Sequence, residues 1–314
     1  MDENLPLLLA GVVTFVFGWN NSGLLIGNER GSGTLSAAES TVLCSIGMLL
    51  GVALEGPKMT KSLGGIISTP TTDTVVLATL LVSIVLTFGL TLGRIPVTFS
   101  ATMVGAFAGA AFVSSAHVRV GDLATIIVFW MLAPLATMAA TFLSYKVIQR
   151  ATANLSLVSV DAFNRAGVGL VSLALAYVLA ANNIGMIYGT SFIGSQPSSA
   201  DSVLTLLVLA AVAVVAMALF GRGSVAGTVG DRLLSLSPQG VLAAFSGTII
   251  VMLVATQLGI PVSVTQCLVG GMFGAAYTKK IAIVNRRLSL EVVASWVVIP
   301  LAAFFLAALV TPLL

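Results

Sequence analysis

The stretch VFGWNNSGLLIG (Val16–Gly27) places two adjacent asparagines, Asn20 and Asn21, behind a run that is almost entirely apolar. A side-chain amide is costly to bury in lipid unless a partner satisfies its hydrogen bonds. A related stretch, AANNIGMIYG (180–189), places Asn182 and Asn183 in the second half of the chain. Because the asparagine pair recurs, we infer that the structure is repeated and that the two pairs have the same kind of role in it.

The composition indicates a protein that crosses the membrane several times. The chain is 58% hydrophobic and only 8% charged, with a mean hydropathy of +1.09, whereas soluble proteins carry about 25% charged residues. Apolar runs of membrane-spanning length are expected near 5–27, 37–55, 73–93, 96–114, 122–145, 166–195, 202–220, 240–258, 261–277 and 291–313. We therefore predict an all-α polytopic membrane protein.

Three landmarks recur in the same order in both halves. After the asparagine pairs, GRIPVTFSATMVGAFAGAA (93–111) matches LGIPVSVTQCLVGGMFGAA (258–276), and FWMLAPLA (129–136) matches SWVVIPLA (295–302). Pro96 follows Asn20 by 76 residues and Pro261 follows Asn182 by 79. This agreement indicates an internal duplication, with a first repeat over 1–150, a cytoplasmic link over 151–165 and a second repeat over 166–314.

An odd number of crossings in each half predicts that the two repeats are inverted relative to each other. If segments alternate, one side holds only Lys58, Lys61 and Arg119. The other side holds Arg30, Arg94, Lys146, Arg150, Arg165, Arg222, Arg232, Lys279, Lys280, Arg286 and Arg287. The positive-inside rule makes the second side cytoplasmic. Both termini are then extracytoplasmic, in a multi-pass protein of the cell membrane.

Inverted repeats with matching helix breaks are typical of secondary transporters. The asparagine pairs, flanked by glycine, are one candidate break, although buried amides also serve simply to hold helices together. The Ile-Pro-Val segments are a second, because proline suits the first turn of a helix. We expect half-helices from Pro96 and Pro261 that meet near mid-membrane, and a kinked helix with self-bonded hydroxyls is the alternative.

The predicted half-helix starts carry hydroxyl and amide side chains. Their free N–H groups and positive dipole ends would form an anion cradle, framed by Thr98, Ser100, Ser263, Thr265 and Gln266. Small polar residues also follow the second asparagine pair in GTSFIGSQ (189–196), with GNERGSG (27–33) as a weaker counterpart. Within the latter, Glu29 and Arg30 are interpreted as an ordinary interfacial pair.

These residues, in this order, resemble the inorganic phosphate transporter (PiT) family. Its pattern, roughly GxNDxANxxGTxxGS in each half followed by PVSTTH, is similar to GWNNSGLLIGNERGS, AANNIGMIYGTSFIGS, IPVTFSA and IPVSVTQ. The resemblance implies that the anion and its coupling ion are surrounded by Asn20, Asn21, Asn182, Asn183, Thr190, Ser191, Thr98, Ser100, Ser263 and Thr265. It spans nearly the whole chain.

The departures from that pattern concern the coupling ion and the substrate. Asn21 and Asn183 replace the family's aspartates, which are expected to hold sodium, although a sodium ion near these two residues stays an option. Ala101 and Gln266 replace its histidine. The PVxxTQ pattern of IPVSVTQ together with the asparagine pairs looks more similar to the sulfate-permease branch of the family. Amides in place of carboxylates also suit sulfate, because sulfate has no proton to donate to an acceptor.

We therefore predict a secondary active transporter for a tetrahedral oxyanion, working by alternating access and coupled to H⁺ or Na⁺. Sulfate is the first choice and phosphate the alternative, with a passive anion channel as a third reading. No catalytic constellation is evident, so an enzyme is not expected, nor is a cofactor other than a coupling ion. The expected partners are the anion and membrane lipid, without nucleic acid. The oligomeric state stays open, although the resemblance implies a homodimer.

Overall fold

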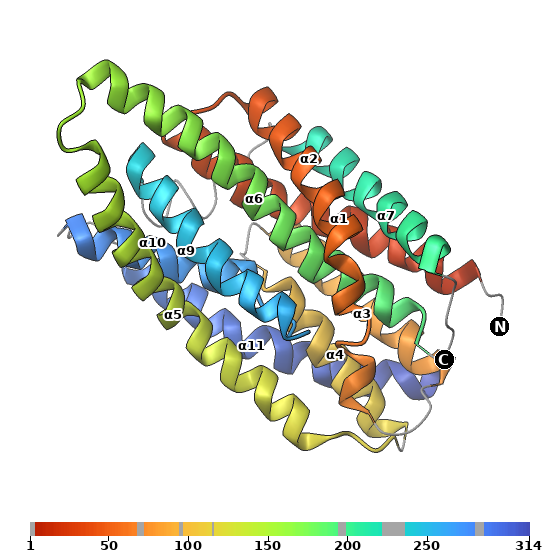
Figure 1. Cartoon of the computed structure of the whole chain (residues 1–314). Helices are drawn as coiled ribbons and strands as arrows, with labels where there is room; N and C mark the ends of the chain where they lie inside the picture. The colour runs from red at the N-terminus through yellow and green to blue at the C-terminus, as the bar shows by residue number, and fades with distance from the viewer. Residues whose placement is uncertain are drawn as a thin grey trace.

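The structure of the chain is a computed structural model that describes residues 4–67, 72–93, 97–114, 116–193, 199–221, 236–279 and 286–314. The described residues form helices joined by short connections, with one isolated antiparallel bridge between Ile67 and Val118. In Figure 1 the helices run as a bundle with both termini at the same end. They are α1 (Asn4–Gly31), α2 (Ala37–Leu54), η1 (Gly56–Met59), η2 (Gly64–Ile66), α3 (Asp73–Leu92), α4 (Phe99–Val113), α5 (Val120–Thr152), α6 (Leu157–Ser191), α7 (Ser199–Phe220), α9 (Pro238–Gln257), α10 (Val264–Lys279), α11 (Arg286–Val310) and η4 (Thr311–Leu313).

Each of the ten predicted apolar runs corresponds to one α-helix of the structure. Eight of the described helices are long and apolar enough to cross a membrane, whereas α4 and α10 have only 15 and 16 residues. Helices satisfy their own backbone hydrogen bonds, which lipid cannot do. The prediction of an all-α polytopic membrane protein is confirmed.

The predicted breaks at the asparagine pairs are wrong. Helix α1 runs unbroken through Asn20 and Asn21, and α6 runs unbroken through Asn182 and Asn183. In each helix the second asparagine donates its amide to the carbonyl one turn earlier, from Asn21 to Phe17 and from Asn183 to Leu179. The side chains therefore bond to an intact helix, and no free backbone is needed.

The short helices begin three residues later than predicted. Pro96 lies outside the described residues, but α4 starts at Phe99, and α10 starts at Val264 rather than at Pro261. Tertiary bonds hold the intervening segment in a non-helical conformation, because the Pro261 carbonyl accepts from the Trp130 indole at 2.8 Å. The prediction of short helices at both places is otherwise confirmed, while Ile95 and Pro96 of the first segment lie outside the described residues.

The predicted link over 151–165 is mostly helical. Helix α5 continues to Thr152 and α6 begins at Leu157, so only 153–156 lie between them. The hydroxyl of Ser156 caps α6 by accepting from the backbone N–H of Ser159 at 3.2 Å, which satisfies one of the free donors at a helix start. The boundaries of the two repeats stay a prediction.

The packing of the helices repeats between the halves. Helix α2 packs on α6 as α7 packs on α1, and α4 packs on α11 as α10 packs on α5. Within each half, α3 packs on α4 as α9 packs on α10. Counted over the described α-helices, every one of these contacts has a counterpart five helices further along, and the strongest join one half to the other. The two halves are therefore interlocked around one core.

Glycines explain how closely these helices approach. Helices α2, α4, α6 and α10 each carry two glycines four residues apart, where a Cβ would collide with the backbone of the helix or turn opposite: Gly47 and Gly51, Gly105 and Gly109, Gly185 and Gly189, Gly270 and Gly274. Small residues at this spacing let membrane helices touch backbone to backbone. Gly185 and Gly189 thus allow η1 and the turn after it to lie against α6, rather than breaking the helix.

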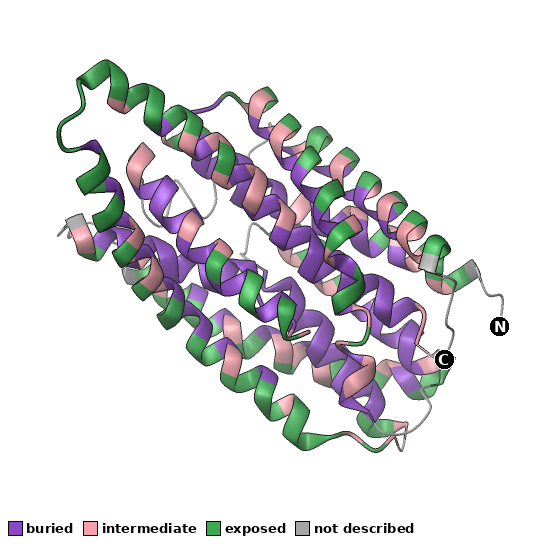
Figure 2. Cartoon of the chain, in the orientation of Figure 1, coloured by how far each residue is buried: buried purple, intermediate pink, exposed green. Residues whose placement is uncertain are grey.

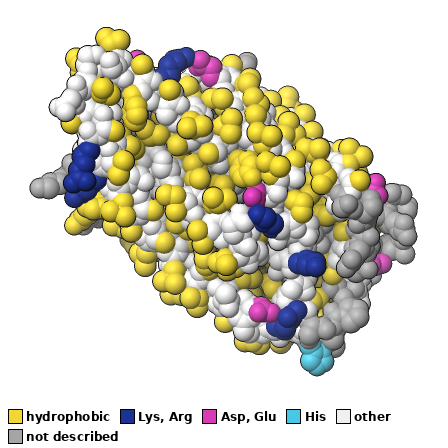
Figure 3. Space-filling view, in the orientation of Figure 1, with side chains coloured by type: hydrophobic (Ala, Val, Ile, Leu, Met, Phe, Trp, Pro, Cys, Tyr) yellow, Lys and Arg dark blue, Asp and Glu magenta, His cyan; other side chains and the backbone are white. Residues whose placement is uncertain are grey.

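The most deeply buried residues lie in the middle of the bundle. The middle of the bundle is formed by α4, α10 and the asparagine-bearing parts of α1 and α6, which are nearly all buried in Figure 2. Hydrophobic side chains cover most of the face seen in Figure 3, while charged side chains gather in a few clusters. An apolar exterior around a buried polar centre is the arrangement expected of a polytopic membrane protein whose polar residues have a role inside the bundle.

Candidate functional site

The starts of α4 and α10 cross and bind each other reciprocally. The Ser100 hydroxyl donates to the Val262 carbonyl at 2.7 Å, and the Thr265 hydroxyl donates to the Val97 carbonyl at 3.1 Å. Ser100 and Thr265 are each the fourth residue after their proline, and Val97 and Val262 are each the first. The two bonds are therefore equivalent under the repeat, and the predicted meeting of the two short helices is confirmed.

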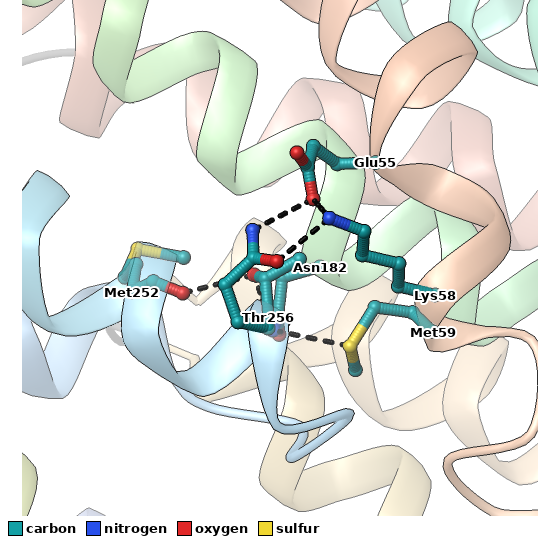
Figure 4. A network of polar contacts seen from close by, with 7 residues as sticks. Glu55, Lys58, Met59, Asn182, Met252 and Thr256 are labelled. Atoms are coloured by element: carbon teal, nitrogen blue, oxygen red, sulfur yellow. Dashed lines mark hydrogen bonds and ion pairs between the residues drawn. The ribbon is translucent and has the colours of Figure 1, made fainter.

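Asn182 anchors the segment that leads into α10. Its amide nitrogen lies 3.1 Å from both the Thr256 hydroxyl and the Ile260 carbonyl, and its oxygen accepts from the Val262 N–H at 3.1 Å. Figure 4 shows Asn182 between the end of α9 and Met59 of η1, whose sulfur is 3.6 Å from the amide. With its donor and acceptor both engaged, Asn182 fixes the backbone of the crossing.

Asn183 connects the same helix to α4. Its side-chain oxygen accepts from the Ser100 hydroxyl at 2.8 Å, so Ser100 lies between α6 and the start of α10. Asn183 is 1% exposed. An amide at this position carries no charge, so the crossing can be closed and dry in this conformation without burying an ion.

Two polar atoms at the crossing have no hydrogen-bond partner. They are the Thr98 hydroxyl and the Gln266 side-chain oxygen, both buried. Thr98 follows Val97 and Gln266 follows Thr265, the pair joined by the second reciprocal bond. Thr98 also precedes α4 without capping it through its side chain. Unpaired buried polar groups are costly. These two atoms are therefore candidates for hydrogen bonds to a polar ligand.

The remaining predicted site residues make other hydrogen bonds, and none of the bonds of Asn20, Asn21, Thr190 or Ser191 joins α4 to α10. The Asn20 amide donates to the Thr91 hydroxyl at 2.8 Å, and Asn21 bonds within its own helix. The hydroxyls of Thr190 and Ser191 donate to carbonyls one turn earlier in α6. Ser263 accepts from the Gln266 N–H at 3.4 Å, as a residue at a helix start does. The structure therefore brings together Asn182, Asn183, Ser100, Thr265, Thr98, Ser263 and Gln266.

The sequence reasoning missed three partners of the site. Thr256 and Thr91 accept the amides of Asn182 and Asn20, and each lies five residues before its proline in TLGRIP and TQLGIP. Aligning the repeats at the prolines would have revealed this pair. Trp130 supports the Pro261 carbonyl, and it lies 131 residues away in the chain, so no local pattern could have indicated it.

A cavity of about 700 Å³ opens beside the crossing. Lys58, Lys61 and Arg119 line it together with Gly259 and Ile260. These are the only three cations that the charge pattern assigned to the outer side. Two residues of its lining, Lys58 and Gln257, belong to the network of polar contacts in Figure 4. Lys58 pairs with Glu55 at 2.6 Å and binds Gln257, while the adjacent Met59 and Thr256 contact Asn182.

Known proteins share sequence similarity with this chain. The sequence model of the "Phosphate transporter family" matches residues 17–170 and again 160–307. A protein of Methanocaldococcus jannaschii named as a phosphate permease is 23% identical over 306 residues, covering 96% of this chain and 95% of its own. The chloroplastic inorganic phosphate transporter 2-1 of Arabidopsis thaliana is 36% identical over 77 residues, 24% of this chain and 13% of its own.

The fold is also that of a solved structure. A protein described as "The sodium-dependent phosphate transporter" superposes with a TM-score of 0.84 over 100% of this chain and 99% of its own, at 16% identity. The family model matches twice, once in each half, as the internal duplication requires. The chain belongs to the phosphate transporter family, whose members are transporters rather than enzymes.

Proposed function

We propose that the chain is a permease for inorganic phosphate that works by alternating access and is coupled to an ion gradient. The anion binds where α4 and α10 cross, between two inverted repeats. The observation that carries this proposal is the pair of unpartnered buried atoms at the crossing, on Thr98 and Gln266, in a chain of the phosphate transporter family.

The chemistry of these atoms favours phosphate over sulfate. Phosphate near neutral pH retains a proton and can donate a hydrogen bond, whereas sulfate only accepts. The free Gln266 oxygen is an acceptor and is suited to a P–O–H group, while the Thr98 hydroxyl and the uncapped start of α4 offer donors to the other oxygens. The sequence reasoning placed sulfate first, and the relatives reported above are named for phosphate. Sulfate therefore becomes the competitor in the test.

The reciprocal bonds give the alternating-access step a physical basis. In this conformation Ser100 and Thr265 satisfy carbonyls of the opposite repeat. An entering anion would accept these hydroxyls and separate the two helix starts. The cavity with Lys58, Lys61 and Arg119 would supply phosphate from the outer side, because cations raise the local concentration of an anion.

The test is uptake of radiolabelled phosphate by the purified protein in sealed proteoliposomes. A coupled transporter accumulates phosphate above its equilibrium level when an ion gradient is applied, whereas a channel only equilibrates it. Unlabelled sulfate should compete at least about tenfold more weakly than unlabelled phosphate, since one hydrogen bond to a charged group contributes about 1.5–3 kcal/mol. Equal competition by the two anions would contradict the assignment of phosphate.

The variant Gln266→Met tests the free acceptor. Methionine has a similar length but no strong acceptor, so phosphate affinity should fall by about 1–3 kcal/mol while sulfate affinity changes little. Gln239→Met is the matched control, because Gln239 binds Thr152 at the start of α9, far from the crossing. If Gln266→Met left the ratio of phosphate to sulfate affinity unchanged, the anion would bind elsewhere.

A further inference from the structure

Glu29 is a carboxylic acid in the interior of the protein. It lies in the last turns of α1 and is 0% exposed, and the structure describes no other acidic residue that is buried. It follows Asn21 by eight residues in the same helix, or about 12 Å along the axis at 1.5 Å per residue. The sequence interpretation as an interfacial pair with Arg30 is wrong, because Arg30 is exposed while Glu29 is buried.

The surroundings of Glu29 are polar but uncharged. The hydroxyls of Ser40 in α2 and Ser172 in α6 face its carboxyl group, and the Cys44 thiol lies nearby. Neither carboxyl oxygen makes a hydrogen bond of good geometry, and the Ser40 hydroxyl is also unpartnered. The Ser172 hydroxyl donates to the Val168 carbonyl, so its lone pairs remain available as acceptors.

Charged groups on the helices packed around α1 are occupied elsewhere or distant. Arg165 of α6 pairs with Glu39 of α2, and Asp161, one turn earlier in α6, is exposed and is itself an acid. Asp73 and Asp201 lie at the starts of α3 and α7, and the far end of α7, at Gly221, is the end that meets Ile26 of α1. Helix α9 carries no charged residue. Among the described residues, no cation compensates Glu29.

A carboxylate in such a site is expensive, and it becomes neutral by taking up a proton. Resting on the proposed phosphate transport, we propose that Glu29 carries the coupling proton, which binds between α1, α2 and α6. In its protonated form Glu29 donates to Ser40 or Ser172, both of which have acceptor capacity. Both motif aspartates of the family are asparagines here, so Glu29 is the buried acid that supplies a titrating group.

The same surroundings favour a proton over a sodium ion. A hard cation requires several oxygen ligands around it, whereas the side chains facing Glu29 supply two hydroxyls and a thiol. A proton requires one carboxyl oxygen and one acceptor. Losing that proton needs water at Glu29, which requires α1 to separate from α2 and α6. Proton release is thereby tied to a change of conformation.

Infrared spectroscopy tests the protonation directly, without any transport. The purified protein should show the C=O band of a protonated carboxyl group that disappears in Glu29→Gln and persists in the control Glu39→Gln, an exposed acid at the start of α2. In Ser40→Ala, which retains Glu29, the band should shift as an acceptor is lost. An unchanged band in Glu29→Gln, or no such band in the wild type, would show that Glu29 is ionised and would overturn the proposal.

Transport in proteoliposomes tests the coupling. With one coupled proton, an inward gradient of two pH units can sustain up to about 100-fold phosphate accumulation. In Glu29→Gln this gradient should stimulate uptake less than about twofold, while phosphate exchange without a gradient continues. Full stimulation in the variant, or stimulation that follows sodium at constant pH, would overturn the proposal. A wild type that moves no phosphate would refute the proposed function, while the infrared band would still decide the state of Glu29.

Discussion

At the scale of single residues, the two asparagine pairs differ in how much they contribute to the stability of the fold. Asn182 satisfies the Val262 N–H and the Ile260 carbonyl, both at the crossing. The variant Asn182→Ala would leave the buried Val262 N–H and the partly buried Ile260 carbonyl without this partner, and a buried group left unpaired costs about 1–3 kcal/mol. We therefore expect the free energy of unfolding to fall by about 2–4 kcal/mol, measured by reversible denaturation in mixed micelles.

The repeat supplies the control for this prediction. Asn20 occupies the equivalent position, is partly exposed and donates to the Thr91 hydroxyl. Asn20→Ala should cost only about 1 kcal/mol, the usual net value of one hydrogen bond. Equal losses for the two variants would mean that the bonds of Asn182 to the α10 segment do not contribute to stability.

At the scale of helices, the paired glycines set the distance between the halves. A Cβ on Gly105 would collide with the Pro300 carbonyl of α11. Gly105→Ala must separate α4 from α11, so we expect a loss of about 1–3 kcal/mol from overpacking. Gly89→Ala in α3 is the control, since its Cβ would meet open space. That variant should be neutral or stabilise the helix by up to about 1 kcal/mol. The midpoint of thermal unfolding measures the effect of each variant. Equal shifts for Gly105→Ala and Gly89→Ala would contradict the explanation by close packing.

At the scale of the whole molecule, the charge pattern predicts which side each end of the bundle faces. Ser159, near the start of α6, and Lys61, at the outer cavity, are both exposed. With the positive-inside rule, Ser159→Cys should resist an impermeant thiol reagent in intact cells, and Lys61→Cys should react readily. The native Cys44 and Cys267 are buried and give little background. Ready labelling at position 159 and protection at position 61 would reverse the topology.

The sequence alone was sufficient for the number, order and approximate ends of the helices. Apolar runs of membrane length leave a chain few alternatives, because every backbone group in lipid must be satisfied within its own segment. The duplication was also visible, since matched prolines and asparagines at matched spacing need no knowledge of contacts. From these two facts followed the short helices after Ile-Pro-Val and the expectation that they meet, whereas the bonds from Ser100 and Thr265 to opposite carbonyls were visible only in the structure.

The tertiary structure decided which polar residues work together. Asn21 and Asn183 are equivalent in the repeat and both bond to their own helix, yet Asn183 also accepts from Ser100 of α4. Glycines that resembled helix breaks are points of backbone contact. Glu29 and Arg30 are neighbours in sequence but differ completely in burial. Most of these outcomes depend on groups far apart in the chain: 80 residues separate Asn182 from Val262, and 131 separate Trp130 from Pro261. Only packing brings such groups together, because a local pattern fixes a helix and its faces but not what lies against them.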